Sequence, residues 1–337
     1  MNSPSSAEPL LQLQDVSVAY RTASGAAVPV VRGVNLQLAP GEILGLAGES
    51  GSGKTQLLLS IIGLNGQHAQ LTGSVRYRGQ ELLGRPIAEL NRVRGARIAT
   101  VFQDPATALN PYLPIGRQLS EVLRFHGGVP GRLARERACE LLEAVQVADP
   151  QRRLQQYPHE LSGGMRQRVV IAMALMASPE ILLADEPTTA LDVTVQSQIL
   201  RLLLQLRERH GIAMVLVSHD MGVIAGLADR VAVMYAGRIV EQAGIDALFE
   251  QPQHPYSEAL QRCVPSLAGP LPQRLPSIPG APPDPAALAP GCAFAPRCAY
   301  RLALCEQRLP ELREAGPGHW KACHYDQPLG RLRGELT

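Results

Sequence analysis

The first part of the chain alternates apolar and polar side chains in short stretches. Residues 11–20 keep this alternation over a full strand length, which is the period of a half-buried β-strand. Two shorter apolar stretches follow at 28–31 and 34–38, with polar residues between them. We therefore expect residues 10–45 to form an antiparallel β-rich region built of several short strands.

Further along, unbroken apolar runs alternate with helical periodicity, as in sheets that are buried on both faces. Residues 114–157 carry apolar side chains at helical spacing, which predicts a helical insert at about 104–160. An Ala-Gly turn at 236–237 predicts a hairpin between the last two strands. The expected strands of this core are 43–47, 73–77, 98–102, 181–184, 214–217, 231–235 and 238–241.

A glycine-rich turn follows the first buried run, and a helical stretch follows the turn. Residues 48–55 read Gly-Glu-Ser-Gly-Ser-Gly-Lys-Thr, the P-loop pattern in its expected context. Glycines let backbone N–H groups converge on phosphate oxygens, and the helix N-terminus adds free amides. Lys54 can reach the β- and γ-phosphates, and the Thr55 hydroxyl can ligate Mg²⁺. The candidate nucleotide-binding residues are Gly48, Ser50, Gly51, Ser52, Gly53, Lys54, Thr55 and Gln56.

Polar side chains also close two later apolar runs. Asp185 and Glu186 follow the run at 181–184, and on a chain with a P-loop such a pair is typical of a Walker B motif. Asp185 would then bind Mg²⁺, and Glu186 would activate an attacking water. The simpler alternative is that the two residues are an exposed acidic pair without a catalytic role. His219 follows the run at 214–217, at the strand end where ligands bind in α/β sheets.

A second glycine pair opens a helix at 161–167, which reads Leu-Ser-Gly-Gly-Met-Arg-Gln. Ser162 is a good N-cap, and the glycines expose backbone amides at the helix N-terminus. Taken alone, this pattern is equally typical of an ordinary helix cap.

The composition limits the classes of protein. With 337 residues, 45% of them hydrophobic, the chain can form one large domain plus a smaller one. A net charge of +2 and 4% aromatic residues argue against a nucleic-acid partner. No signal-peptide pattern opens the chain, and no apolar run approaches about 18 residues. We therefore expect a cytosolic protein whose six cysteines are thiols or metal ligands rather than disulfides.

The chain changes character after the hairpin. Residues 252–290 hold 11 of the 28 prolines and are expected to be extended and irregular. Four cysteines follow with 5, 6 and 17 residues between them, without the Cys-x2-Cys pair of common zinc sites. They suit a [4Fe–4S] cluster or tetrahedral zinc, with free thiols or partial disulfides as a third alternative. Cys139 is expected to pack on a helix face, and Cys263 has no assigned role. The four are Cys292, Cys298, Cys305 and Cys323.

Together these motifs resemble the nucleotide-binding subunit of an ATP-binding-cassette (ABC) transporter over residues 10–245, in that family's order. The stretch at 161–167 matches the family's Leu-Ser-Gly-Gly-x-x-Gln signature, which is specific in combination with a P-loop. The D-loop falls at 190–192. The positions that match the adenine-stacking aromatic, the Q-loop, the D-loop aspartate and the switch histidine are Tyr20, Gln103, Asp192 and His219.

The resemblance implies an active ATPase that works as a head-to-tail pair. ATP would be clamped between the P-loop of one cassette and the signature of the other, and hydrolysis would open the pair. The catalytic residues that the resemblance implies are Gln103, Glu186 and His219. The implied Mg²⁺ ligands are Thr55, Gln103 and Asp185. The residues implied at the partner's nucleotide are Ser162, Gly163 and Gly164, and the D-loop residue Asp192 is also implied in nucleotide binding.

Three more stretches, at 102–111, 254–260 and 291–324, resemble the importers of dipeptides, oligopeptides and nickel. This branch implies a peripheral subunit on the cytoplasmic face of the plasma membrane. Its expected partners are a second, unlike ATPase subunit, two transmembrane permease subunits and, indirectly, a periplasmic or extracellular substrate-binding protein. The branch also favours the [4Fe–4S] cluster over zinc, in a structural role.

Two alternatives stay open. Nickel or another small cargo would use the same machine. A soluble ABC ATPase of DNA repair or translation is disfavoured, because the stretch between 55 and 162 lacks sustained heptads and the chain holds one cassette.

The predicted fold class is therefore α/β: a P-loop NTPase (RecA-like) core with an antiparallel β subdomain and a helical subdomain, plus a small Cys-rich C-terminal segment. The predicted boundaries are 1–245 for the nucleotide-binding domain, 246–291 for a Pro-rich linker and 292–337 for the Cys-rich segment.

Overall fold

The computed structural model describes residues 8–22, 25–189, 191–264 and 277–330. Its contacts divide the chain into two compact units that interleave along the sequence. The first unit contains Leu38–Glu42 and Gly84–Val217, and the second contains Leu10–Gln37, Ile43–Leu83 and Ser218–Thr337. Within the described ranges, every helix is too short or too polar to cross a membrane. The domain boundaries expected from the sequence stay predictions.

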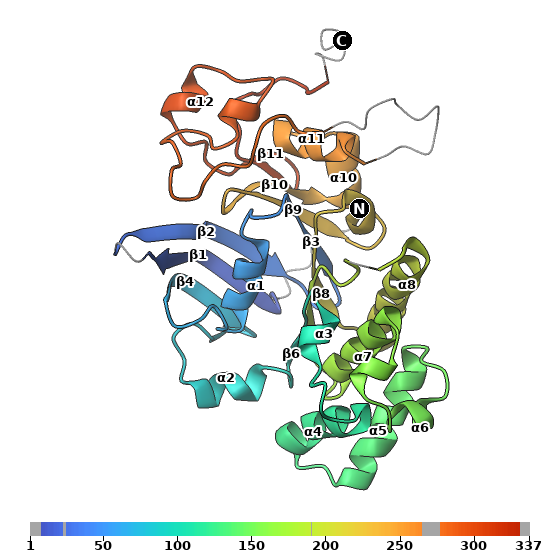
Figure 1. Ribbon diagram of the computed structural model, residues 1–337. Helices are drawn as coiled ribbons and strands as arrows, with labels where there is room; N and C mark the ends of the chain where they lie inside the picture. The colour runs from blue at the N-terminus through green and yellow to red at the C-terminus, as the bar shows by residue number, and fades with distance from the viewer. Residues whose placement is uncertain (1–7, 23–24, 190, 265–276, 331–337) are drawn as a thin grey trace. The chain divides into compact units, whose positions relative to one another are not determined.

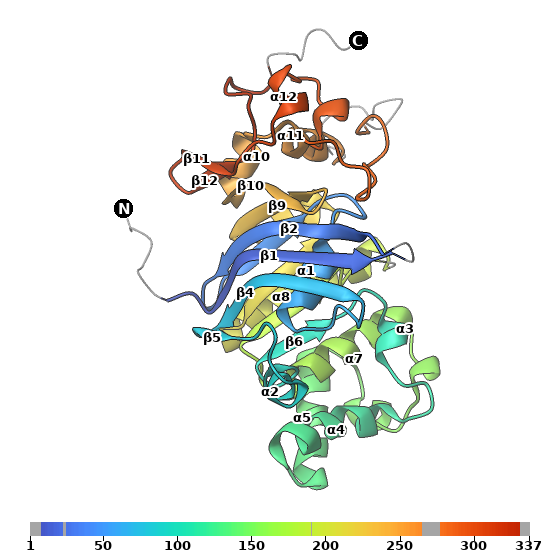
Figure 2. The same ribbon diagram turned by 90° about the vertical axis from the view of Figure 1, so that its left-hand side faces the viewer.

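In the second unit, the N-terminal strands form an antiparallel sheet in the order β2-β1-β4-β5, which Figure 2 shows face on. The register of β1 on β4 pairs Leu11 with Tyr77 and Tyr20 with Ala69. The two strands expected at 28–31 and 34–38 are one continuous strand, within which Gly33 takes a positive φ of 61°. The strands are β1 (Leu11–Arg21), β2 (Ala27–Leu38), β4 (Ala69–Tyr77) and β5 (Gln80–Glu81).

The second unit also holds five strands of another sheet, in the order β3-β9-β10-β12-β11. The buried strand β3 runs parallel to β9, and β9 and β10 form the expected hairpin. Ala236 and Gly237 turn this hairpin with positive φ at both positions, as a type I′ turn requires. The last two strands come from the Cys-rich segment and were not expected. The strands are β3 (Ile43–Ala47), β9 (Arg230–Tyr235), β10 (Arg238–Gly244), β11 (Arg313–Gly316) and β12 (His319–Lys321).

The expectation of an extended Pro-rich stretch from 252 is wrong at its start, because α11 forms there. Pro255 occupies the first helical position, where a missing N–H does no harm, and the His254 side chain caps the helix by accepting from Tyr256 N. Residues 265–276 of the expected linker lie outside the described residues, and 277–290 form neither helix nor strand. The helices of this unit are α1 (Lys54–Ile61), α9 (Met221–Ala225), α10 (Ile245–Glu250), α11 (Pro255–Arg262), η2 (Ala295–Arg297) and α12 (Leu304–Gln307).

In the first unit, three buried parallel strands lie in the order β6-β7-β8: Ile98–Val101, Ile181–Asp185 and Ala213–Ser218. Their register pairs Val101 with Ala184, and Asp185 with Val217. Because parallel strands end at one edge, the polar residues after β6 and β7 emerge side by side.

The helices expected in 114–157 are present as α4, α5 and α6, and Figure 1 shows them gathered beside α7. Leu119, Ala138 and Leu142 are fully buried where α4, α5 and α7 pack together. The helices of this unit are α2 (Ile87–Val93), α3 (Pro105–Ala108), α4 (Ile115–Gly127), α5 (Gly131–Ala144), α6 (Pro150–Arg153), η1 (Pro158–Glu160), α7 (Gly163–Leu175) and α8 (Val193–His210).

Candidate nucleotide-binding site

The P-loop follows β3 and turns through three glycines with positive φ. A Cβ on Gly48 would lie 2.3 Å from the carbonyl oxygen of Met234, and one on Gly53 would lie 2.5 Å from that of Val30. Gly51 has open space around it and needs glycine only for its φ of 79°. The loop is therefore packed against its own unit on one side and open on the other.

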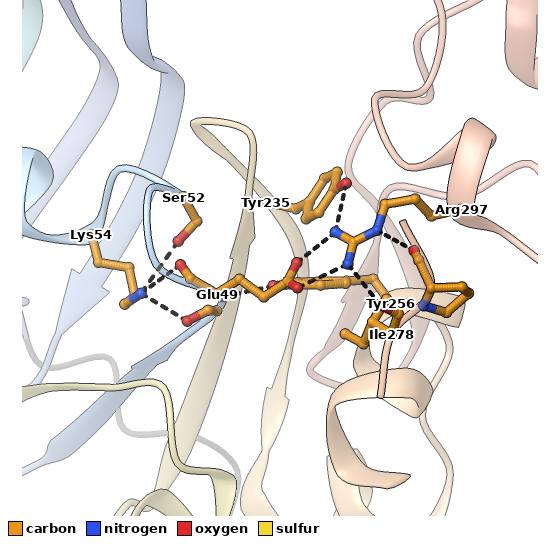
Figure 3. A network of polar contacts seen from close by, with 9 residues as sticks. Glu49, Ser52, Lys54, Tyr235, Tyr256, Ile278 and Arg297 are labelled. Atoms are coloured by element: carbon orange, nitrogen blue, oxygen red, sulfur yellow. Dashed lines mark hydrogen bonds and ion pairs between the residues drawn. The ribbon is translucent and has the colours of Figure 1, made fainter. Parts of the chain in front are cut away.

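Lys54 begins α1 and is only 5% exposed. Its Nζ donates to the carbonyl oxygens of Gly48, at 2.7 Å, and Glu49, at 2.9 Å, which Figure 3 shows. In the described part of the chain no side chain caps α1, and Ser50 and Thr55 lie exposed beside its N-terminus. This arrangement leaves a cation and two hydroxyls beside an uncapped helix end, the composition of a phosphate site.

Tyr20, at the end of β1, lies against the start of α1. Its hydroxyl contacts Gln56 Oε1 and, at 2.8 Å, the carbonyl oxygen of Asn65. The Asn65 amide donates to the Gln56 carbonyl at 2.8 Å. The structure thus brings the two expected residues Tyr20 and Gln56 together through Asn65, which no sequence pattern pointed to.

The Walker B residues lie at the end of β7 in the first unit. Asp185 is 5% exposed, and Glu186 has a positive φ of 47°, a conformation that costs a non-glycine residue about 1–2 kcal/mol. The Glu186 carboxylate accepts from Gln103 Nε2 at 3.1 Å and from Thr189 Oγ1 at 2.8 Å. The structure therefore brings the candidate residues Gln103 and Glu186 together, and Thr189 is a contributor that the sequence analysis missed.

The signature residues open α7. Ser162 Oγ accepts from Met165 N at 3.4 Å, and Asp192 caps α8 by accepting from Val195 N at 2.9 Å. A Cβ on Gly164 would lie 2.7 Å from Val195, so glycine is needed for α7 to approach α8. The two caps share an open hollow of about 450 Å³. Its lining residues are Ser162, Gly163, Gly164, Met165, Arg168, Leu191, Asp192, Val195 and Gln198.

The structure therefore joins the signature and the D-loop aspartate into one surface. Residue 190 of the expected D-loop lies outside the described residues. Arg168 holds the back of this surface: its guanidinium donates to the Val145 carbonyl at 2.8 Å and to Gln198 Oε1 at 2.7 Å. Burial lowers the pKa of this guanidinium. Sequence reasoning missed Arg168, although its place on the buried face of the signature helix was a usable signal.

His219 lies exposed directly after β8, and Asp220 behind it caps α9. The role of His219 as the switch histidine, which the resemblance implies, stays a prediction.

A buried acid in the second unit was also missed. Glu241 on β10 is fully buried and accepts from the backbone N–H groups of Gln253, at 2.6 Å, and His254, at 2.9 Å. It also contacts His319 Nε2 at 2.7 Å. Burial lowers the pKa of His254 to about 4, so His254 is neutral and can accept from Tyr256 N. Glu241 thus fastens both α11 and β12 to the sheet.

The four C-terminal cysteines line one cavity, together with His254 and Phe294. Burial raises the pKa of Cys298 to about 12 and that of Cys323 to about 11, and Cys323 Sγ accepts from Tyr325 N at 3.4 Å. Among the described residues, no group of three or more His, Cys, Asp or Glu is arranged to hold a metal ion. The expected iron–sulfur or zinc ligation is therefore not confirmed.

The chain was compared with known proteins. The family described as ABC transporter matches residues 31–189, and the family described as oligopeptide/dipeptide transporter, C-terminal region, matches 240–305. The oligopeptide transport ATP-binding protein OppD of Salmonella typhimurium is 45% identical, over 95% of both chains. A relative from Brucella abortus, named for peptide import and ATP binding, is 50% identical over 91% of this chain and 92% of its own.

Among solved structures, the dimeric post-hydrolysis state of the ATP-binding cassette MJ0796, bound to ADP and Pi, has a TM-score of 0.63 and 32% identity. It covers 70% of this chain and 98% of its own. This likeness confirms the α/β P-loop fold expected from the sequence.

Proposed function

The chain belongs to the ATP-binding subunits of ABC transporters, and on that premise we propose that it powers the import of dipeptides and oligopeptides. Membership makes it an ATPase. Relatives named for oligopeptide transport and peptide import, matched over nine-tenths of both chains, support this cargo class. The match of 240–305 to a peptide-transporter C-terminal region supports it independently and disfavours DNA repair and translation.

The observation that carries the catalytic proposal is the contact of Glu186 with Gln103 and Thr189 at the end of β7. A carboxylate oriented in this way would polarise the water that attacks the γ-phosphate. Lys54 and the P-loop amides would hold the phosphates, Tyr20 would stack on the adenine, and His219 would contact the γ-phosphate.

The proposed Mg²⁺ site is assigned to Thr55, Gln103 and Asp185. A hydroxyl, an amide oxygen and a carboxylate are all oxygen donors of the kind that Mg²⁺ prefers. Asp185 lies at the end of β7 and is 5% exposed. When bound, the ion would neutralise charge on the phosphates.

The signature hollow would cover the nucleotide of a second cassette. Ser162, Gly163 and Asp192 are exposed around it, at the N-termini of α7 and α8, and both helix ends favour an anion. The dimeric MJ0796 cassette supports this pairing. The second cassette is assigned to an unlike ATPase subunit, two permease subunits would bind the pair, and the complex would lie at the cytoplasmic face of the membrane.

A [4Fe–4S] cluster is assigned to Cys292, Cys298, Cys305 and Cys323, with zinc as the alternative. The support is that all four cysteines line one cavity, and that thiolates are ligands suited to an iron–sulfur cluster or to zinc. Iron, zinc and acid-labile sulfide analysis of the anaerobically purified chain tests this. Four iron and four sulfide per chain support the cluster, and neither metal bound would contradict both assignments.

Coexpression with the candidate permeases, followed by reconstitution, tests the function itself. We expect ATP hydrolysis that rises when a binding protein loaded with a di- or oligopeptide is added. Stimulation by nickel alone, or copurification with ribosomes or DNA and no membrane subunit, would contradict the proposal.

A further inference from the structure

The P-loop carries an acid, Glu49, between Gly48 and Ser50. A carboxylate in a loop that binds a triphosphate is unfavourable, because like charges a few ångströms apart repel in a site with little water. The Glu49 side chain is 24% exposed, so water screens it only in part. Some other group has to offset its charge if the loop is to bind nucleotide.

That group is Arg297, which lies 248 residues later in η2 of the Cys-rich segment. Its guanidinium makes a two-pronged ion pair with Glu49: Nη1 to Oε2 at 2.7 Å and Nη2 to Oε1 at 2.9 Å, as Figure 3 shows. The Arg297 side chain is only 5% exposed. Planar, bidentate and buried pairs of this kind are the strong ones.

Arg297 is itself held in place on its other edges. Its Nε donates to the Pro279 carbonyl at 2.8 Å, and its Nη1 also reaches the Tyr235 hydroxyl at 3.2 Å. Tyr235 packs against Tyr256 and Phe294, with ring centroids 4.5 and 5.3 Å away. The guanidinium therefore has a fixed position, and it holds Glu49 in place rather than following it.

The pair also fixes the backbone of the loop. Glu49 N donates to the Tyr256 hydroxyl at 2.7 Å, while the Glu49 carbonyl accepts from Lys54 Nζ at 2.9 Å. One residue thus connects the Cys-rich segment, α11 and the phosphate-binding lysine (Figure 3).

We propose that Arg297 is a positioning residue for ATP, through which the Cys-rich segment sets the nucleotide affinity of the P-loop. Arg297 neutralises the Glu49 carboxylate and draws it away from the phosphate side of the loop. The peptide unit of Glu49 then keeps the geometry in which Lys54 and the loop amides meet the phosphates. The inference rests on the proposed role of the P-loop as the ATP site.

The test is Mg·ATP binding by the full chain, measured by titration calorimetry in matched variants. Arg297→Gln exposes the uncompensated carboxylate to the phosphates and weakens ATP binding by about tenfold or more. Glu49→Gln removes the repelling charge and keeps the wild-type affinity within about threefold. The double variant Glu49→Gln/Arg297→Gln recovers most of the loss, because no buried charge remains.

This asymmetry separates positioning from a merely structural ion pair. A pair that only stabilises the fold would weaken with either single substitution, and the double variant would be no better than Arg297→Gln. Either result, or an unchanged affinity in Arg297→Gln, overturns the inference. Arg301→Ala is the matched control, since Arg301 lies in the same segment and pairs with Glu306 while both are half exposed.

Two further outcomes are distinguishable. If the wild-type chain binds no Mg·ATP, the proposed function fails first. If Arg297→Gln does not fold, the double variant decides, because it lacks the unpaired buried charge: affinity within about threefold of wild type supports the inference, and a tenfold loss overturns it. At saturating ATP the reconstituted Arg297→Gln transporter is expected to keep its kcat, with only KM raised.

Discussion

Two glutamates of the candidate site are held in opposite ways. Glu186, at the end of β7, accepts from an amide and a hydroxyl, those of Gln103 and Thr189. Glu49, in the P-loop, is gripped by the guanidinium of Arg297 at 2.7 and 2.9 Å. Neutral donors orient a carboxylate with little change to its charge, whereas a guanidinium orients it and neutralises it.

The difference matches the work assigned to each residue. A carboxylate that polarises water needs its negative charge. A carboxylate beside bound phosphates has to lose that charge. Hence loss of the Glu186 carboxylate should lower turnover, whereas loss of the Arg297 guanidinium should lower nucleotide affinity.

The largest expected effect is at Glu186. Glu186→Gln keeps the shape of the side chain and its place beside Gln103 but removes the base, so kcat should fall by about 10²- to 10⁴-fold. Steady-state phosphate release from the reconstituted complex measures it. Glu180→Gln, an ion-paired acid just before β7, is the control and should keep its rate. A decrease in kcat of less than about threefold in Glu186→Gln would contradict the role of Glu186 as the base.

Glycine substitutions in the P-loop should disturb the backbone geometry that holds the phosphates. Gly48→Ala puts a Cβ 2.3 Å from the Met234 carbonyl. We expect the free energy of unfolding to fall by about 3 kcal/mol and ATP binding to be lost. Gly51→Ala meets nothing within 4 Å and should cost only about 1 kcal/mol, for its φ. Chemical denaturation of both variants checks this, and equal losses would contradict the packed geometry of the loop.

The stability contributed by α11, the helix that holds Tyr256 against Glu49, should depend on pH. His254 caps the helix that presents Tyr256 to Glu49, and its folded-state pKa of about 4 lies below the ordinary value of 6.5. The unfolded chain therefore binds a proton first, and stability falls as pH drops from about 6.5 toward 4. A fall of this pKa from 6.5 to about 4 lowers the free energy of unfolding by about 2 kcal/mol at pH 5.

His254→Asn keeps a side-chain acceptor for Tyr256 N and removes the titrating group. Urea unfolding at pH 7.5 and pH 5 should then show a smaller decrease for His254→Asn than for the wild-type chain. Identical decreases in the two proteins would mean that His254 is not the group responsible.

The smallest expected effect is at Thr189. Thr189→Val removes the 2.8 Å hydrogen bond to Glu186 at nearly constant volume, and kcat should fall by about three- to tenfold with the KM for ATP unchanged. Ser197→Ala, which removes a hydroxyl bonded to its own helix, is the control. An altered KM with unchanged kcat would assign Thr189 to binding instead of to orienting Glu186.

Local sequence patterns predicted the elements that carry these residues. The apolar runs at 43–47 and 181–184 marked buried strands, and the glycines after the first run marked the P-loop. Parallel pairing of Val101 with Ala184 then placed Gln103 beside Glu186. These features depend on contacts between near neighbours or on strand order, both of which leave a periodic trace.

The missed features depend on contacts between distant residues. Glu49 and Arg297 are separated by 248 positions, and Glu241 and His319 by 78, so no spacing rule links them. The prediction that the proline-rich stretch from 252 is extended was wrong for a different reason. Proline disfavours the interior of a helix but suits its first turn, which is where Pro255 lies in α11.

The most direct test of this account is a side-by-side ATP titration of reconstituted transporters that carry Glu186→Gln or Arg297→Gln. The account predicts that Glu186→Gln loses kcat by at least about 100-fold while ATP still binds, and that Arg297→Gln raises KM by about tenfold at nearly unchanged kcat. If both substitutions change the same kinetic parameter, either kcat or KM, the two carboxylates do not have the separate roles described above.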